Sequence, residues 1–406
     1  MNLWSKISFM LNIETKHTGK TAFLHLGFRP LFFAAISFGL VSIALWLAIY
    51  TFGKGLLPNS YPIISWHAHE MIFGFATATV SGFLLTAVKN WTGIQSINGK
   101  PLLGLFLLWL FARILAFVPT AWALPTLAVI DSLYLLIVTV AFSIPVFKIR
   151  QWKNLAFSGK LLVLFIANII FYLGLLGYLD NGVHYGLYMG FYTVLAVIFN
   201  MGRRVIPFFI EKGLGCPFEA KNYYWVDVSS LWLFLTFSIV DVLYPNKYLV
   251  AALALALVVL HGARVYGWYH KAIWQKSLLW VLLMGYTWVV IGFVLKFAAA
   301  FVSISPFLAL HAFAYGGIGM ITAGMMARVS LGHTGNNVFE PPKILNFIFS
   351  LLFIGAIVRI ILPLFLSQFY VHLIGLSQVL WIIAFLIFFV VYAPMLIKSR
   401  ADGRPG

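Results

Sequence analysis

Residues 28–52 read FRPLFFAAISFGLVSIALWLAIYTF, and Arg29 is the single charged side chain in this run. An α-helix needs about 20 mostly apolar residues to cross the hydrocarbon core of a bilayer. A run of this length and composition therefore predicts a membrane-spanning helix. Similar runs, separated by short polar segments, recur along the rest of the chain.

The composition of the whole chain agrees with this first run. Of its 406 residues, 62% are hydrophobic and 9% are charged, whereas a soluble domain carries about a quarter charged residues. This excludes a soluble globular protein. We predict an all-α polytopic membrane protein with about twelve transmembrane helices. The predicted spans are residues 28–52, 66–88, 101–118, 121–146, 159–179, 183–206, 225–243, 248–270, 277–301, 306–328, 343–364 and 370–396.

Lysine and arginine residues gather on one side of the predicted bundle. The chain has 27 of them against 10 Asp and Glu, a net charge of +17. When loops are assigned to alternate sides, 22 of the 27 fall on the side of the N-terminus. These include Lys6, Lys16, Lys20 and Arg404. Cytoplasmic loops are enriched in positive charge, so we predict that both termini are cytoplasmic.

This distribution also bears on partners and on domain organisation. Because the positive charge is spread over seven segments instead of forming one basic patch, we expect the lipid bilayer as partner and no nucleic acid. We predict a single membrane domain, 28–396, between a cytoplasmic N-terminal segment, 1–27, and a cytoplasmic tail, 397–406. The single cysteine, Cys216, excludes an intramolecular disulfide and a multi-cysteine metal site.

Histidines at membrane depth are the main candidates for function, because ionisable groups there are costly and usually functional. The second span opens with Trp66-His67-Ala68-His69-Glu70-Met71 and enters from the outer side. His67 and His69 diverge by about 200° around a helix, so they suit two sites, or one site and one structural contact. We expect His67, Glu70 and Met71 to share one face.

His311 opens the tenth span at a comparable depth, so these three histidines converge if the second and tenth spans are neighbours. Neutral imidazole suits haem iron and copper, and Met71 suits Cu(I). The glycines that follow His311 leave room either for a flat macrocycle or for a closely packed helix. Weaker metal-ligand candidates are His261, His333, His184 and His372.

Three cations lie inside apolar spans, at a depth close to that of the histidines: Arg113, Lys296 and Arg359. They either extend to the outer headgroups or mark a buried anionic ligand, for which haem propionates are a candidate. Asp131 is the deepest carboxylate, and with Glu70 it is a candidate for a proton path.

The second, sixth and tenth spans all run inward and are spaced four helices apart. The second begins His67-Ala68 and the tenth begins His311-Ala312. This spacing suggests three four-helix units, as in the core subunits of haem–copper oxidases. We use the likeness as a fold-level analogy only.

The chain resembles the NnrS family of bacterial membrane proteins. The resemblance is carried by residues 27–33, 66–75, 82–93, 202–209 and 328–335, together with Leu279-Trp280, Gly285-Tyr286 and Trp288. It implies a haem- and copper-containing protein of the bacterial cytoplasmic membrane that is associated with the response to nitric oxide. One departure is Leu283, where the family pattern often has a histidine. Copper occupancy is therefore less secure than haem.

The leading hypothesis is a protein that binds haem b and copper and binds or turns over NO or a related small molecule. His69 and His311 are the first choice as axial haem ligands, His67 with Met71 as ligands of a second metal, and Arg113 or Arg359 as propionate partners. The alternatives are a secondary transporter of a metal complex or small solute, and a metal chaperone or assembly factor. The sequence indicates no electron donor.

Overall fold

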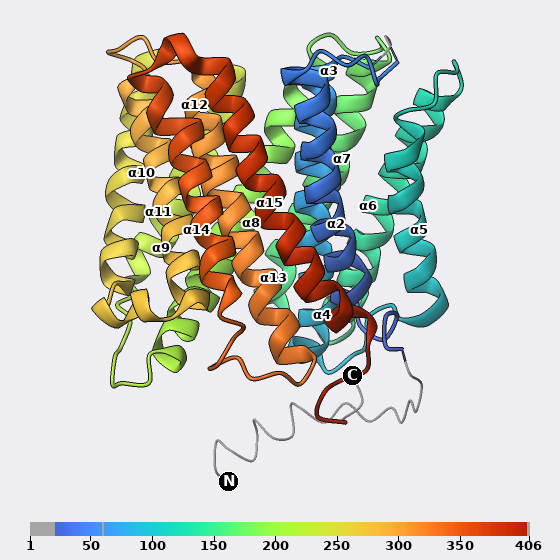
Figure 1. The fold of residues 1–406 in the computed structure, drawn as a ribbon, viewed down its shortest axis with the longest axis vertical. Coiled ribbons are helices and arrows are strands. Elements are labelled where there is room, and N and C mark those ends of the chain that lie inside the picture. Colours follow the sequence, from blue (N-terminus) through green and yellow to red (C-terminus); the bar gives the residue numbers. More distant parts are fainter. Residues whose placement is uncertain (1–20, 59–60, 404–406) are drawn as a thin grey trace.

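The computed structural model describes residues 21–58 and 61–403, which form a bundle of long helices (Figure 1). Within these residues no strand is present, and the only β-pairing is an isolated bridge between Thr21 and Lys398. The α-helices are α2 (Phe28–Trp46), α3 (Ile63–His69), α4 (Thr77–Thr92), α5 (Gly99–Leu115), α6 (Ala123–Lys148), α7 (Leu155–Leu175), α8 (Gly182–Gly213), α9 (Tyr224–Leu243), α10 (Lys247–Trp268), α11 (Ser277–Ala298), α12 (Pro306–His311), α13 (Met320–His333), α14 (Ile344–Ala356) and α15 (Tyr370–Ile397).

Short helices of other types complete the spans. The 3-10 turns are η3 (Trp152–Asn154), η4 (Lys271–Gln275), η7 (Leu362–Leu364) and η8 (Ser367–Phe369). Four segments are π-helical, in which each backbone N–H reaches five residues back. They are η1 (Leu47–Thr51), η2 (Glu70–Ala76), η5 (Ala312–Gly319) and η6 (Ile357–Ile361).

Each of the twelve predicted spans corresponds to a helical segment, so the prediction of an all-α polytopic membrane protein is confirmed. In the described part of the chain, eleven segments are long and apolar enough to cross a membrane. The twelfth is α5, which has 17 residues and falls slightly short of the usual length of about 20. The π-helical segments lie inside or at the end of four of these spans.

The two described ends of the chain lie side by side. The backbone N–H of Ala22 donates to the carbonyl of Ile397 at 2.9 Å. Arg29 donates to the carbonyls of Met395, Leu396 and Lys398 at 3.2, 3.1 and 2.8 Å, and so satisfies acceptors that the end of α15 leaves open. In Figure 1, α3 and α12 lie at the opposite end of the bundle. We call the end near Thr21 the cytoplasmic end, as the charge distribution assigns it.

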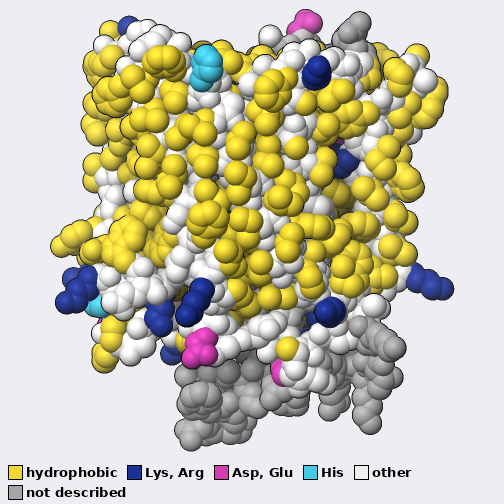
Figure 2. Space-filling view, viewed as in Figure 1, with side chains coloured by type: hydrophobic (Ala, Val, Ile, Leu, Met, Phe, Trp, Pro, Cys, Tyr) yellow, Lys and Arg dark blue, Asp and Glu magenta, His cyan; other side chains and the backbone are white. Residues whose placement is uncertain are grey.

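The surface matches a membrane environment. Apolar side chains cover most of the face drawn in Figure 2, and most of its lysines and arginines lie near the cytoplasmic end. The helices therefore contact the lipid hydrocarbon directly. Lys6, Lys16, Lys20 and Arg404, which the sequence analysis placed on the cytoplasmic side, lie outside the described residues.

The glycines of the tenth span serve helix packing. A Cβ on Gly317 would lie 2.7 Å from Val289 of α11, and one on Gly324 would lie 2.7 Å from Val281 of the same helix. A Cβ on Gly319 would lie 2.7 Å from the indole of Trp381 in α15. Of the two explanations for the glycine run, the structure therefore supports close packing. The space beside these glycines is filled by neighbouring side chains.

Candidate functional site

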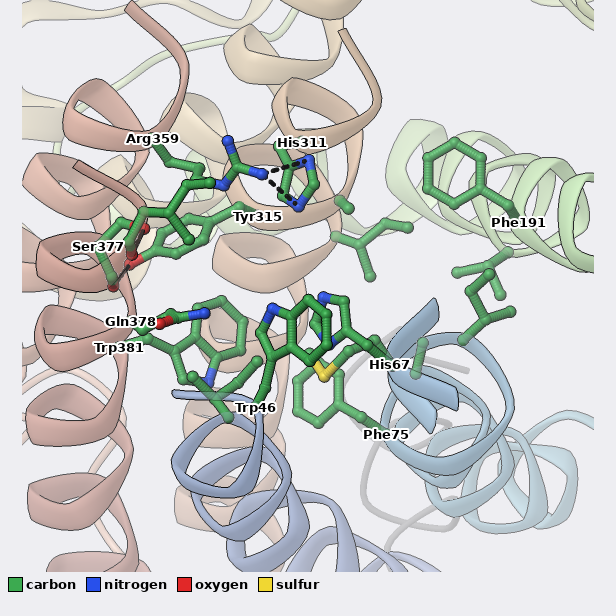
Figure 3. A pocket seen from close by; sticks show the side chains of 18 residues that line it. Trp46, His67, Phe75, Phe191, His311, Tyr315, Arg359, Ser377, Gln378 and Trp381 are labelled. Atoms are coloured by element: carbon green, nitrogen blue, oxygen red, sulfur yellow. Dashed lines mark hydrogen bonds between the residues drawn. The ribbon is translucent and has the colours of Figure 1, made fainter. Parts of the chain in front are cut away.

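A cavity of about 90 Å³ lies between the second and tenth spans (Figure 3). His67 and Met71 approach it from the second span, and His311 from the tenth. Arg359 of η6 is the only charged side chain among its described lining residues. The remaining walls are mostly apolar and come from α2, α8 and α15. The second, sixth and tenth spans thus meet around one cavity.

The π-helical segments gather at this cavity. Met71 and Phe75 belong to η2, Tyr315 belongs to η5 and Arg359 belongs to η6. The fourth segment, η1, is joined to the wall through Thr51, whose hydroxyl donates to Gln378 at 3.0 Å. π-Helical turns occur often at functional sites. Their concentration around this cavity shows that its walls depart from regular α-helical geometry.

His67 is held by stacking and keeps a free nitrogen. Its ring lies parallel to the Trp46 indole, with centroids 4.3 Å apart and an interplanar angle of 2°. Within the described part of the chain its Nδ1 is buried and has no hydrogen-bond partner. The sulfur of Met71 accepts a hydrogen bond from the Ser42 hydroxyl at 3.5 Å. Both side chains therefore present soft or borderline donor atoms near the cavity.

His311 has a defined tautomer. Its Nδ1 lies 2.7 Å from the carbonyl of Phe307, and a carbonyl only accepts, so Nδ1 carries the proton. Nε2 then has its lone pair available, and Nη2 of Arg359 lies 3.3 Å from it. A backbone carbonyl that fixes one ring nitrogen is the usual support for a metal-ligating histidine, but here Arg359 donates to the other nitrogen.

His69 does not join the other two histidines, and this corrects the expected convergence of three. Its Nε2 lies 2.8 Å from Asn168 Oδ1 and its Nδ1 lies 3.2 Å from Glu70 Oε1. The ring also stacks on Phe171, with centroids 4.4 Å apart. The two-residue spacing from His67 turns His69 to the opposite face of α3. Both of its nitrogens have partners, so His69 lies outside the cavity that His311 lines, and its pairing with His311 at one haem stays a prediction.

His69 belongs to a buried charge cluster. Arg113 donates to Glu70 Oε2 at 2.8 Å and also to Asp131 Oδ1, and the hydroxyl of Tyr172 donates to Asp131 Oδ2 at 3.1 Å. Glu70 therefore faces away from the cavity, unlike His67 and Met71. The expectation of one shared face fails because the helix changes from α to π at Glu70, which alters the number of residues per turn.

The three cations inside the spans also differ in whether they line the cavity. Arg113 is bound in the charge cluster, and Nζ of Lys296 lies 2.7 and 2.8 Å from the two carboxylate oxygens of Asp241. Tyr192 also donates to Asp241. Neither Arg113 nor Lys296 lines the cavity, so the three cations are not gathered around it. Arg359 is the one that lines it.

The weaker histidine candidates lie away from the cavity. His261 is buried between Phe199 and Phe293, and its Nδ1 lies 2.7 Å from the hydroxyl of Tyr286. The other three contact aromatic rings: His333 lies against Phe28, His184 against Tyr188 and His372 against Phe369. Among residues 21–58 and 61–403, no three His, Cys, Asp or Glu side chains are placed to hold one metal ion.

Several residues of the site were not found from the sequence. Trp46 of α2 and Gln378 and Trp381 of α15 line the cavity. They sit in long apolar runs, where an aromatic or a single amide carries no signal of its own. Only the knowledge that the first and last membrane helices pack beside the second span would have indicated them.

The comparison with known protein families gives a match over nearly the whole chain. The family model described as NnrS protein matches residues 22–400. The chain belongs to the NnrS family. Membership associates it with the nitric oxide response and with a multi-pass location in a membrane. The NnrS-like stretch 66–75 supplies His67, Met71 and Phe75 to the cavity. A search of the curated proteins found no match.

Proposed function

We propose that this protein binds a copper ion in the cavity between the second and tenth spans, and that NO or a related small molecule binds at that ion. It would act in the cytoplasmic membrane of a bacterium. The observation that carries the proposal is the meeting of His67, Met71 and His311 around one cavity. Two imidazoles and a thioether are ligands that copper accepts, with the thioether favouring Cu(I).

The state of these donors supports the assignment. Nδ1 of His67 is buried without a described partner, and an unsatisfied buried nitrogen costs about 1–3 kcal/mol. His311 keeps Nε2 unprotonated because Nδ1 donates to Phe307. A bound copper ion would satisfy Nδ1 of His67, would replace Arg359 as the partner of His311 Nε2, and would supply a redox-active centre with an open position for the small molecule.

The cavity does not fit haem b as its side chains are arranged. Its volume of about 90 Å³ is well below the roughly 300–1,000 Å³ of pockets for ligands of drug size. Trp46 fills the space beside His67 by stacking on its ring. We therefore assign this cavity to a metal ion with a small ligand.

Arg359 would act on the bound small molecule. Its guanidinium lies 3.3 Å from His311 Nε2 and contacts the Tyr370 hydroxyl at 3.5 Å. A buried guanidinium donates strong hydrogen bonds to an oxygen that carries negative charge. Arg359 would therefore hold an anionic or polarised ligand beside the ion, instead of the haem propionate first considered.

Glu70 and Asp131 would hold a proton close to the site. Two carboxylates face one guanidinium, and both ring nitrogens of His69 lie next to acceptor oxygens. These contacts place two carboxylates, one guanidinium and one imidazole next to one another in one buried cluster. Glu70 directly precedes Met71 in the chain, so the cluster that would hold the proton is adjacent in sequence to a proposed copper ligand.

Copper and haem quantification on the purified protein, with a visible spectrum, tests the proposal. We expect about one copper ion per chain, and its loss in His67→Ala and in His311→Ala. His372→Ala is the matched control, because His372 is an exposed histidine outside the cavity. Copper that stays in both cavity variants, or a haem Soret band that disappears in them, overturns the assignment.

A further inference from the structure

A second hollow lies between α7, α8 and α9, and it has a volume of about 740 Å³. None of the described residues lines both this groove and the metal cavity. Lys160, Arg203 and Asp227 line it near the cytoplasmic ends of their helices, and Tyr185 and Leu243 line it near the outer ends. The groove therefore extends along most of the membrane depth.

The groove is open to lipid, because α9 forms one of its walls and is barely covered by the bundle. Only Ser230, Phe234 and Phe237 of α9 are buried. Trp232 and Leu235, which line the groove, are 68% and 49% exposed. Hydrocarbon chains in the surrounding bilayer have direct access to this wall.

Positive charge exceeds negative charge at the cytoplasmic mouth of the groove. Nη1 of Arg203 lies 3.2 Å from one oxygen of Asp227, and Nη2 of Arg264 lies 2.7 Å from the other. One carboxylate is thus shared by two guanidinium groups. Lys160 donates to the carbonyl of Ala156 in its own helix. Within the described residues, Nε of Arg203 is buried and has no hydrogen-bond partner.

We propose that this groove binds one anionic phospholipid from the cytoplasmic leaflet, with its phosphate at Lys160 and Arg203 and an acyl chain along α8 and α9. The apolar wall matches an acyl chain, and the cationic mouth matches a phosphate at headgroup depth. A neutral quinone or a second copy of the protein would leave the excess positive charge unmatched. The inference is independent of the metal site.

Native mass spectrometry on the full-length protein in detergent tests this binding. The protein is incubated with equal amounts of phosphatidylglycerol and phosphatidylcholine, and the ratio of the two bound lipids is measured. We expect phosphatidylglycerol to be preferred. A basic residue near anionic lipid contributes about fivefold in binding, so the Lys160→Gln/Arg203→Gln variant should lower the ratio by about five- to 25-fold.

The matched control is Lys148→Gln/Lys271→Gln, which removes two exposed cations from the same side but outside the groove. It should leave the ratio unchanged. An equal fall in both variants would show general attraction to the surface and would overturn the proposal. Equal retention of the two lipids by the wild type would also overturn it.

A second pair of variants tests the groove without altering charge. Ala196 lines the groove on α8, and Ala252 is an exposed alanine of α10 outside it. Ala196→Phe should reduce the amount of bound phosphatidylglycerol, and Ala252→Phe should not. Unchanged binding in Ala196→Phe contradicts the location of the acyl chain. A bound neutral quinone that phosphatidylglycerol fails to displace would identify a different occupant.

Discussion

His67 and His69 lie two positions apart in α3 and face opposite sides of the helix. His67 borders a cavity and keeps a free nitrogen, whereas His69 completes a charge cluster with Glu70, Asp131 and Arg113. The same side chain therefore lines the proposed metal cavity in one position and completes the charge cluster in the other. Its hydrogen-bond partners make the difference.

This difference predicts unequal effects on stability. His69→Ala leaves two buried carboxylates with one cationic partner, and breaking a buried ionic network costs about 3–5 kcal/mol. His67→Ala leaves no charge behind and loses mainly its stacking on Trp46, about 0.5–1.5 kcal/mol. Denaturant unfolding in detergent measures both values. Equal losses in the two variants would show that the cluster does not stabilise the fold.

A second prediction for a single residue concerns Arg359. Arg359→Met should leave copper content unchanged and weaken the binding of azide, a small anionic probe, to the Cu(II) protein by at least tenfold, because a hydrogen bond to a charged group is worth about 1.5–3 kcal/mol. Titration of the azide-to-copper charge-transfer band measures the affinity. Lys247→Met, at an exposed lysine at the start of α10, is the control and should not alter it.

At the scale of helices, the four π-helical segments all border the cavity or are joined to its wall. A π-helical turn holds one residue more than an α-helical turn. It rotates the side chains that follow, as seen where Glu70 turns toward Arg113 while Met71 faces the cavity. The irregular helices thus assign neighbouring residues to two different sites.

Shortening η2 tests this role. Deletion of Ile72 should let the segment become regular α-helix, keep the register of α4 and move Met71 and Phe75 relative to His67. We expect the protein to insert and fold but to lose copper. Deletion of Ala78, inside the regular helix α4, is the control and should abolish folding, because it turns one side of the helix by about 100°. Loss of folding in both deletions would contradict a local role for η2.

At the scale of the whole molecule, the bundle could be predicted from the sequence because lipid imposes a simple rule on apolar runs. Each of the twelve predicted apolar runs corresponds to a helical segment of the structure. The matching depth of His67 and His311 also followed from the sequence, whereas the contact between the second and tenth spans was only a condition for their convergence. Hydropathy reports how deep a residue lies, and this part of the site depends on depth.

The rest of the site depends on how the helices are rotated and on which helices are neighbours, and hydropathy reports neither. A regular period of 3.6 residues placed Glu70 beside His67, and η2 overturned that placement. Arg113, Lys296 and Arg359 share one depth but have three different environments. Their partners come from spans far apart in the chain, so no local pattern distinguishes them.

X-ray absorption spectroscopy on the copper-loaded protein tests the shared ligation by His67 and His311 most directly. The account predicts two imidazole nitrogens and one sulfur in the first coordination shell of the wild type. Each of His67→Ala and His311→Ala should remove one imidazole from that shell, and His372→Ala should remove none. A shell without two imidazoles in the wild type, or one unchanged in His67→Ala and His311→Ala, would contradict the account.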